Sequence, residues 1–329
     1  MKTRDTWLAP LAAAAMAIGA ATCTLLPPEP TAGPAAVATP PPQAPPVALP
    51  NASNSMKVGV MGDFGNGSRV QYETAAQMFK TYQTFPYELV LLTGDNLYGD
   101  ERPQDFELKF EKPYKPLLDA GVKFYASLGN HDSRAQRTYK PFNMGDRLYY
   151  SFKAPKQDVR FIALESTYPE PEQIKWLEDE LKGAREAWKV MFFHHPLYSS
   201  GERHGSDTQL RDVLEPLFIK YNVSIVLTGH DHFYERTKPQ KGIVYFVVGA
   251  GGQLRRGNID RTSGITARGF DSDTSFMVGE FIEDEFIFQA ISRSGQIVDS
   301  GIVIRRKEED SGKAAGAAAG RSIRAGSRF

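Results

Sequence analysis

The sequence predicts an α/β fold, and two observations carry this prediction. The first is a βαβ unit, with an apolar strand at 56–61, a helical segment at 68–84, a second apolar strand at 87–92 and glycine-rich turns after both strands. The second is a set of apolar runs that end directly in a polar residue of metal-ligand type: Asp63, Asp95, Asn130, His194 and His230. Because sites in α/β sheets form at the carboxyl ends of strands, these endings predict one shared site.

The next part of the chain continues the alternation of helix and strand. From 98 to 118 the pattern is helical, and Pro113 and Pro116 are expected to break it. Apolar runs then predict strands at 122–128, 148–152 and 159–164.

The clearest helix is predicted at 171–188, where apolar residues recur at helical spacing among charged neighbours. A strand at 189–193, a helix at 207–221 and a strand at 223–228 follow. The last third reads as strands and hairpins, at 243–252 and 276–293.

Residues 1–26 predict an export signal, because Lys2 and Arg4 precede an uncharged run too short to span a bilayer comfortably. Cys23, the single cysteine, leaves open cleavage before a lipid-modified cysteine that would anchor the protein to a membrane. An uncleaved hydrophobic anchor is a further alternative. The expected location is therefore exported: periplasmic, envelope-attached or secreted.

Three further segments follow the signal. A proline-rich, extended linker is expected at 27–55, because this stretch has few core-forming residues. The folded domain is expected at 56–305, and a tail of charge, alanine, glycine and serine at 306–329 is expected to be disordered.

Composition excludes some classes of function. Lys+Arg and Asp+Glu both number 39, so the formal net charge is zero, which argues against nucleic acid as the main partner. One cysteine cannot form an internal disulfide.

The candidate ligands are oxygen and nitrogen donors. A carboxylate such as Asp95 can bridge two cations, and a phenol three residues later, Tyr98, suits a hard trivalent metal. Taken alone, the pair also fits a capping aspartate beside a packed tyrosine. All 6 histidines fall in these strand-end motifs or in the loop just after one. With no thiolate among them, the donors favour two metal ions over a structural zinc.

Five blocks resemble, in order, the motifs of the calcineurin-like metallophosphoesterases: Gly-Asp-Phe-Gly at 62–65, Gly-Asp-Asn-Leu-Tyr at 94–98, Gly-Asn-His-Asp at 129–132, His-His-Pro at 194–196 and Gly-His-Asp-His at 229–232. Tyr98 narrows the resemblance to purple acid phosphatases of the small, tartrate-resistant type. The resemblance implies a two-sheet β-sandwich flanked by helices, in an α/β/β/α arrangement.

The resemblance also implies a dinuclear metal centre, with Fe(III) beside Fe(II), Zn(II) or Mn(II). The expected ligands are Asp63, Tyr98 and His232 for the ferric ion, Asn130, His194 and His230 for the divalent ion, and Asp95 as the bridge. Such a metal pair clamps a phosphoryl oxygen and lowers the pKa of a bound water, which supplies a hydroxide nucleophile.

Two histidines have catalytic roles in this resemblance. His131 matches a position that contacts phosphate or the nucleophile, and His204 a loop position near the leaving group, where it could donate a proton. A surface-loop histidine is the alternative for His204, because Arg203 stands where the family has glutamate. His195 stands where the family often has an aromatic residue, which favours a supporting or packing role. Asp231 is expected to orient the ligands beside it or their loop.

Other residues depart from the pattern or have no assigned role. Ser133 replaces a second histidine common in the mammalian enzymes, and Arg134 next to it is either a source of positive charge or a solvated loop residue. Arg255 and Arg256 follow a glycine turn and are assigned no role.

The expected function is an exported acid phosphatase that hydrolyses small-molecule phosphate monoesters with broad specificity, since the metals engage only the phosphate. Two alternatives remain open. One is a phosphodiesterase or nucleotide pyrophosphatase that uses the same site, and the other is a non-catalytic phosphate-binding envelope protein.

Overall fold

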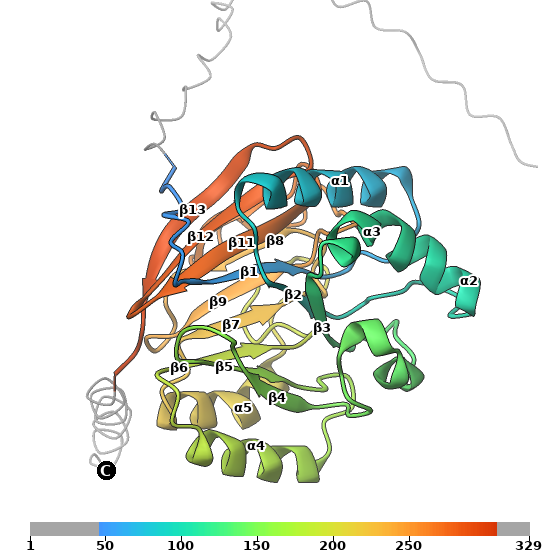
Figure 1. Ribbon diagram of the computed structural model, residues 1–329. Coiled ribbons are helices and arrows are strands. Elements are labelled where there is room, and N and C mark those ends of the chain that lie inside the picture. The colour runs from blue at the N-terminus through green and yellow to red at the C-terminus, as the bar shows by residue number, and fades with distance from the viewer. Residues whose placement is uncertain (1–45, 308–329) are drawn as a thin grey trace, which may run out of the picture. The chain divides into compact units, whose positions relative to one another are not determined.

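Two sheets stacked face to face, with helices on both outer sides, form the domain (Figure 1). The computed structural model describes residues 46–307. The strand order is β13-β12-β11-β1-β2-β3 in the six-stranded sheet and β10-β8-β9-β7-β6-β5-β4 in the seven-stranded sheet. The predicted two-sheet sandwich flanked by helices is confirmed.

The six-stranded sheet combines the predicted βαβ unit with a C-terminal meander. Its parallel strands β1, β2 and β3 lie in chain order, and β11 pairs with β1 in the antiparallel sense. The strands are β1 (Met56–Met61), β2 (Leu89–Thr93), β3 (Lys123–Ser127), β11 (Ser275–Ile282), β12 (Glu285–Ser292) and β13 (Ile297–Ile304).

The seven-stranded sheet has a parallel centre, β5-β6-β7-β9, with antiparallel strands at both margins. Its strands are β4 (Tyr150–Lys153), β5 (Val159–Ala163), β6 (Trp188–Phe192), β7 (Ile225–Thr228), β8 (Tyr234–Thr237), β9 (Val244–Val248) and β10 (Thr266–Phe270). The sequence did not predict β8 and β10, because they are short and β10 is only half-buried.

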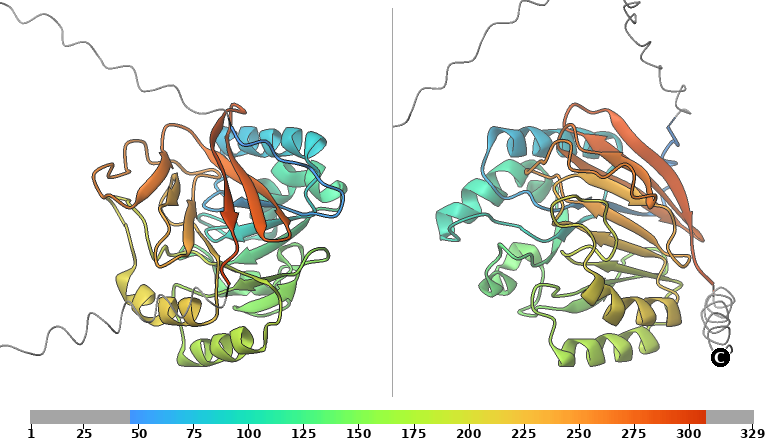
Figure 2. Two further views of the ribbon diagram at one scale, coloured as in Figure 1. Left: turned by 90° about the vertical axis from the view of Figure 1, so that its left-hand side faces the viewer. Right: turned by 180° about the vertical axis from the view of Figure 1, so that it is seen from behind.

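Helices cover the outer face of each sheet (Figure 2). They are α1 (Arg69–Thr84) and α3 (Lys112–Asp119) on the six-stranded sheet, and α4 (Pro171–Gly183) and α5 (Thr208–Lys220) on the other. Side-chain caps define two of the starts. Ser68 accepts a hydrogen bond from the N–H of Gln71 before α1, and Asp207 accepts one from Leu210 before α5.

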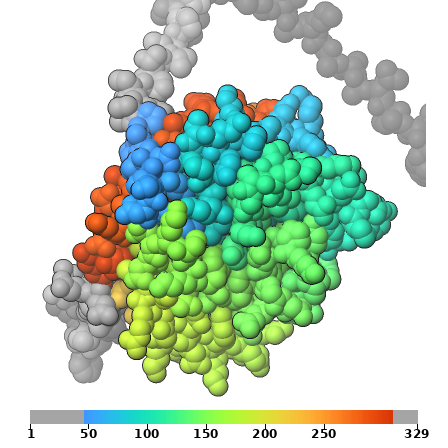
Figure 3. Space-filling view, viewed as in Figure 1, coloured from blue at the N-terminus to red at the C-terminus, as the bar shows by residue number. Residues whose placement is uncertain are grey.

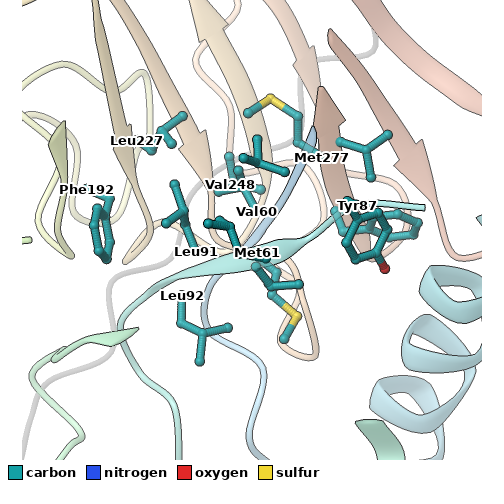
Figure 4. Packing of buried hydrophobic residues seen from close by; sticks show 14 of the residues in the cluster. Val60, Met61, Tyr87, Leu91, Leu92, Phe192, Leu227, Val248 and Met277 are labelled. Carbon is teal, nitrogen blue, oxygen red and sulfur yellow. The ribbon is translucent and has the colours of Figure 1, made fainter. Parts of the chain in front are cut away.

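Alternation of side chains along each strand divides the core into layers. In β6, Val190 and Phe192 face the other sheet, whereas Met191 packs with α4 and α5. Figure 4 shows the same division in β2, where Leu91 and Leu92 lie on opposite sides of the strand.

Two helix boundaries differ from the prediction. Pro113 and Pro116 do not break the chain out of helix: α2 (Pro103–Phe106), a π-helical turn at Glu107–Glu111 and α3 run on without interruption. Pro113 directly follows the π-helical turn, in which the N–H of Lys112 bonds to the carbonyl oxygen of Glu107, and the helix continues through a residue that has no N–H. Helix α4 ends at Gly183 and not at 188, because Trp188 opens β6 and pairs with Val159 of β5.

Part of the segment expected to be a linker lies along the six-stranded sheet (Figure 3). The N–H groups of Asn51 and Ala52 donate to the carboxylate of Glu280, and that of Val47 donates to Ser300. The predicted signal at 1–26, Cys23, the linker up to 45 and the tail from 308 lie outside the described residues. Within 46–307, no helix is long and apolar enough to cross a membrane.

Candidate metal centre

Five strand ends from both sheets meet at one edge of the sandwich. β1, β2 and β3 are neighbours in one sheet, and β6 and β7 are neighbours in the other. The turns that follow are sharp: Asp63, Asp95 and His230 have φ values of 55°, 50° and 70°. Such left-handed backbone is uncommon for non-glycine residues and occurs often at functional sites.

A glycine lets two of these turns approach each other closely. A Cβ atom on Gly129 would collide with the backbone and carboxylate of Asp95. Glycine at this position therefore allows the β3 turn to bring Asn130 close to the β2 turn.

The first group of polar atoms consists of Asp63, Tyr98 and His232. The Tyr98 hydroxyl lies 3.3 Å from Oδ1 of Asp63 and 3.3 Å from Nε2 of His232. Nε2 of His232 is also 3.4 Å from Oδ1 of Asp63. These three side chains, from three separate segments, thus present one oxygen or nitrogen each to a common point.

The second group centres on His194, whose side chain is fully buried. Its Nδ1 lies 3.0 Å from the carbonyl oxygen of Thr93. A carbonyl only accepts, so Nδ1 carries the proton and Nε2 carries a free lone pair. That Nε2 lies 3.0 Å from Oδ1 of Asn130, 3.1 Å from Nδ1 of His230 and 3.4 Å from Oδ1 of Asp95.

These distances fit metal ligation. The lone pair of His194 Nε2 faces Oδ1 of Asn130 and Oδ1 of the Asp95 carboxylate, and both of these oxygens are hydrogen-bond acceptors. Two atoms that each lie about 2.1 Å from one cation are about 3.0–3.4 Å apart. One ligand atom each from Asp63, Asp95 and His194 falls within 4.8 Å of the others. The seven residues predicted as ligands therefore lie together, and their donors suit two cations.

Burial makes this arrangement electrostatically unfavourable without a cation. The pKa of Asp63 is raised well above its usual range by burial and by the charge of Asp95, and burial also raises the pKa of Asp95. The imidazoles respond in the opposite sense: burial lowers the pKa of His194, and of His230, where His194 adds to the effect. Cations would offset the repulsion between the carboxylates and use the neutral nitrogens.

The same buried environment shifts the pKa values of Tyr98 and His232. Burial and the charge of Asp63 raise the pKa of Tyr98, so its phenol is protonated in the absence of metal. Burial and Arg255 lower the pKa of His232 to about 4. Nε of Arg255 donates to Nδ1 of His232 at 3.3 Å. Ligation through Nε2 of His232 therefore requires the ring proton to move to Nδ1 and Arg255 to turn away.

The two predicted catalytic histidines lie at the mouth of the site, and both are exposed. The N–H of His131 donates to Oδ1 of Asp95 at 3.0 Å, and its ring packs on that of Tyr98, with centroids 4.8 Å apart. The His204 ring lies 4.2 Å from the His230 ring. The structure thus places both beside predicted ligands.

Asp231 holds the loop that carries His204. Its Oδ2 accepts hydrogen bonds from Oγ of Ser199 at 2.5 Å and from the N–H of Gly205 at 3.2 Å. Burial raises the pKa of Asp231 to about 6. The carboxylate is therefore directed at the loop between β6 and α5.

Several residues near the site were given no role from the sequence. The carboxylate of Asp132 joins the β2 and β3 turns through the N–H groups of Asn96 and Gly129. Ser166, after β5, contacts His194 and His195. Asp132 could have been identified from the sequence, because it is the aspartate of the third block, whereas nothing in the sequence singled out Ser166.

Unlike Arg255, the arginines Arg134 and Arg256 contact groups outside the predicted ligand set. Arg134 forms an exposed ion pair with Glu170 at 3.1 Å. Arg256 donates to the carbonyl oxygen of Ser272.

The chain is similar in sequence to a known acid phosphatase and in fold to solved structures. Human tartrate-resistant acid phosphatase type 5 is 27% identical over 241 residues, which cover 61% of this chain and 74% of the human protein. Among solved structures, GAP50, the anchor in the inner membrane complex of Plasmodium, superposes with a TM-score of 0.65 at 18% identity, covering 80% of this chain and 94% of GAP50. Purple acid phosphatase PPD1 from yellow lupin gives a TM-score of 0.64 at 21% identity, covering 80% of this chain and 56% of the lupin protein.

The family model described as calcineurin-like phosphoesterase matches residues 56–234, which is more than half of the chain. This stretch runs from the first residue of β1 to the first residue of β8, and it contains all seven predicted ligands. The chain belongs to the calcineurin-like phosphoesterase family.

Proposed function

We propose that this metallophosphoesterase is an acid phosphatase that hydrolyses small-molecule phosphate monoesters at a dinuclear metal centre. The observation that carries the proposal is the convergence of acceptor atoms around Nε2 of His194, with Asp95 between this group and that of Asp63. Similarity to tartrate-resistant acid phosphatase supports the choice of monoesters.

The proposed ligands are divided between two cations. Asp63, Tyr98 and His232 would hold a ferric ion, Asn130, His194 and His230 would hold Fe(II), Zn(II) or Mn(II), and Asp95 would bridge them. When bound, the pair would polarise the phosphoryl group and lower the pKa of a water, so that hydroxide would be available to attack phosphorus. A phenol ligand favours a trivalent ion in the first position.

The side chains at the mouth supply the rest of the chemistry. His131 would donate a hydrogen bond to a phosphate oxygen, and His204 would deliver a proton to the departing alkoxide oxygen. Burial, together with Arg255, lowers the pKa of His204. The protonated form needed for this step therefore declines as the pH rises through a value below 6.5, so we expect an acidic optimum.

The location is proposed as exported, with or without an anchor at Cys23. The support is the charge and apolar pattern of residues 1–26. Cell fractionation and mass spectrometry of the mature N-terminus test this, and Cys23→Ala shows whether a lipid is attached there.

The function is tested on the purified full chain. Metal content is measured, and hydrolysis of p-nitrophenyl phosphate is followed from pH 4 to 8 beside a diester such as bis-p-nitrophenyl phosphate. We expect two metals per chain, faster monoester turnover in acid, and loss of both in Asp95→Ala. The matched control, Asp119→Ala, removes an exposed carboxylate on α3 and should leave both unchanged. Absence of metal and of turnover in the wild type would exclude the proposal.

A further inference from the structure

The hydroxyl of Ser166 makes an unusual set of contacts beside the proposed metal site. It lies in the loop after β5 and is 6% exposed. Its Oγ lies 3.2 Å from the backbone nitrogen of His194, 3.0 Å from that of His195 and 3.0 Å from Nδ1 of the His195 ring. One hydroxyl therefore contacts three nitrogen atoms of two consecutive residues.

The direction of each hydrogen bond follows from the chemistry of the groups. The two backbone N–H groups can only donate, and they occupy both lone pairs of Oγ. The single hydroxyl hydrogen must then point to Nδ1 of His195, which accepts. A neutral imidazole whose Nδ1 accepts carries its proton on Nε2. Ser166 thus fixes His195 as an Nε2–H donor.

The ring that carries this donor lies beside the proposed divalent metal ligands. The His195 ring packs on the His230 ring with centroids 4.4 Å apart, and stands at 87° to the His194 ring. One candidate ligand atom from each of the three histidines lies within 4.8 Å of the others. Since Nδ1 of His195 accepts from Ser166 and Nε2 carries the hydrogen, neither nitrogen offers a free lone pair to a cation. The trio therefore consists of two ligands and one donor, and not of three ligands.

We infer that His195 binds an oxygen of the substrate phosphate through its Nε2–H, and that Ser166 is the positioning residue that sets this tautomer. The inference rests on the proposed phosphatase function and adds a phosphate-binding side chain at a position for which the sequence favoured a supporting or packing role. An anionic oxygen is the acceptor that a neutral N–H beside two cations would meet.

The first test needs neither metal nor activity. Two-bond ¹H–¹⁵N correlation spectra of the metal-free full chain, with His195 assigned by loss of its signals in His195→Gln, report which ring nitrogen carries the proton. We expect an unprotonated Nδ1 and a protonated Nε2 in the wild type and in Ser166→Thr, and loss of this preference in Ser166→Ala. A protonated Nδ1 in the wild type overturns the inference.

The second test uses inorganic phosphate as a competitive inhibitor of protein whose metal content has been measured. His195→Phe keeps a ring of similar size but has no donor, and removal of a hydrogen bond to a charged group should weaken phosphate binding about tenfold or more. His195→Gln keeps an N–H near the position of Nε2 and should remain within about threefold of the wild type. Equal affinity of the Phe variant and the wild type overturns the inference while the phosphatase function stands. Failure of the wild type to bind phosphate or metal instead refutes the proposed function.

Discussion

Oδ2 of Asp132 accepts two hydrogen bonds from Asn96, one from its backbone N–H at 3.0 Å and one from its side-chain nitrogen at 3.1 Å. The same carboxylate accepts from the N–H groups of Leu97 at 3.0 Å and Gly129 at 2.8 Å. Asp132 therefore locks the turn that presents Asp95 to the turn that presents Asn130, although it is not among the proposed metal ligands.

Replacing Asp132 should disturb both turns together. In Asp132→Ala, the buried N–H groups lose their acceptor, which should lower the free energy of unfolding by about 3 kcal/mol or more. Urea unfolding and metal content measure the effect, and metal affinity should fall as well. Asp119→Ala, at an exposed carboxylate of α3, is the control and should change stability by less than about 0.5 kcal/mol. Equal stability of the two variants would contradict this role for Asp132.

Because Asp63 and Asp95 repel each other, Asp95→Asn should have opposite effects on stability in the metal-free and the metal-bound protein. In metal-free protein, Asp95→Asn removes one of two buried like charges, and its Oδ1 can still accept from the N–H of His131. Asparagine also tolerates the positive φ of this position. The metal-free variant should therefore be more stable than the wild type by about 1 kcal/mol or more, whereas the order reverses with metal.

A buried carboxylate with cationic and hydroxyl partners supplies the matched control. Asp299 accepts from Arg236 at 2.7 Å and from Tyr234 at 2.8 Å. Asp299→Asn should therefore destabilise the protein by about 3 kcal/mol whether or not metal is present. Unfolding in EDTA and in excess metal checks both variants. A destabilised metal-free Asp95→Asn would show that the two carboxylates do not repel each other.

From the sequence, the site could be predicted more completely than the fold could. Residues that follow buried strands are visible as polar endings of apolar runs, so Asp63, Asp95 and His194 could be placed together from topology alone. Ser166 could not, because it comes after a strand that ends without a ligand, and its function depends on hydrogen bonds to His194 and His195.

The errors in the fold have local causes. Helical periodicity continues past Gly183, and only pairing of Trp188 with β5 shows that the helix has ended. The prolines of α3 suggested an interruption, but the π-helical turn before it accommodates Pro113 without a break. Pairing partners and tolerated prolines are tertiary properties, which propensity does not encode.

Replacing Tyr98 by phenylalanine should cause little loss of stability. The contacts of its hydroxyl with Asp63 and His232 are long, at 3.3 Å each, so Tyr98→Phe should change the free energy of unfolding by less than about 1 kcal/mol. Because burial keeps its phenol protonated, metal-free protein should show no visible absorption, and added ferric ion should produce a band that Tyr98→Phe lacks. Spectra of both proteins with equal iron content decide the point. A visible band in the variant would exclude phenolate ligation by Tyr98.

The depressed pKa of His232 predicts how stability changes with pH. Burial and Arg255 hold this pKa at about 4 against an ordinary 6.5, so between these values the native metal-free protein binds fewer protons than the unfolded chain. Stability therefore rises with pH across this window, and the contribution present above 6.5 is lost as the pH falls towards 4. Relative to His232→Asn, the wild type should lose about 3 kcal/mol between pH 6.5 and 4 in EDTA. Urea unfolding at half-unit steps measures this difference, and a gap that stays constant with pH would show that His232 titrates alike in the folded and unfolded states.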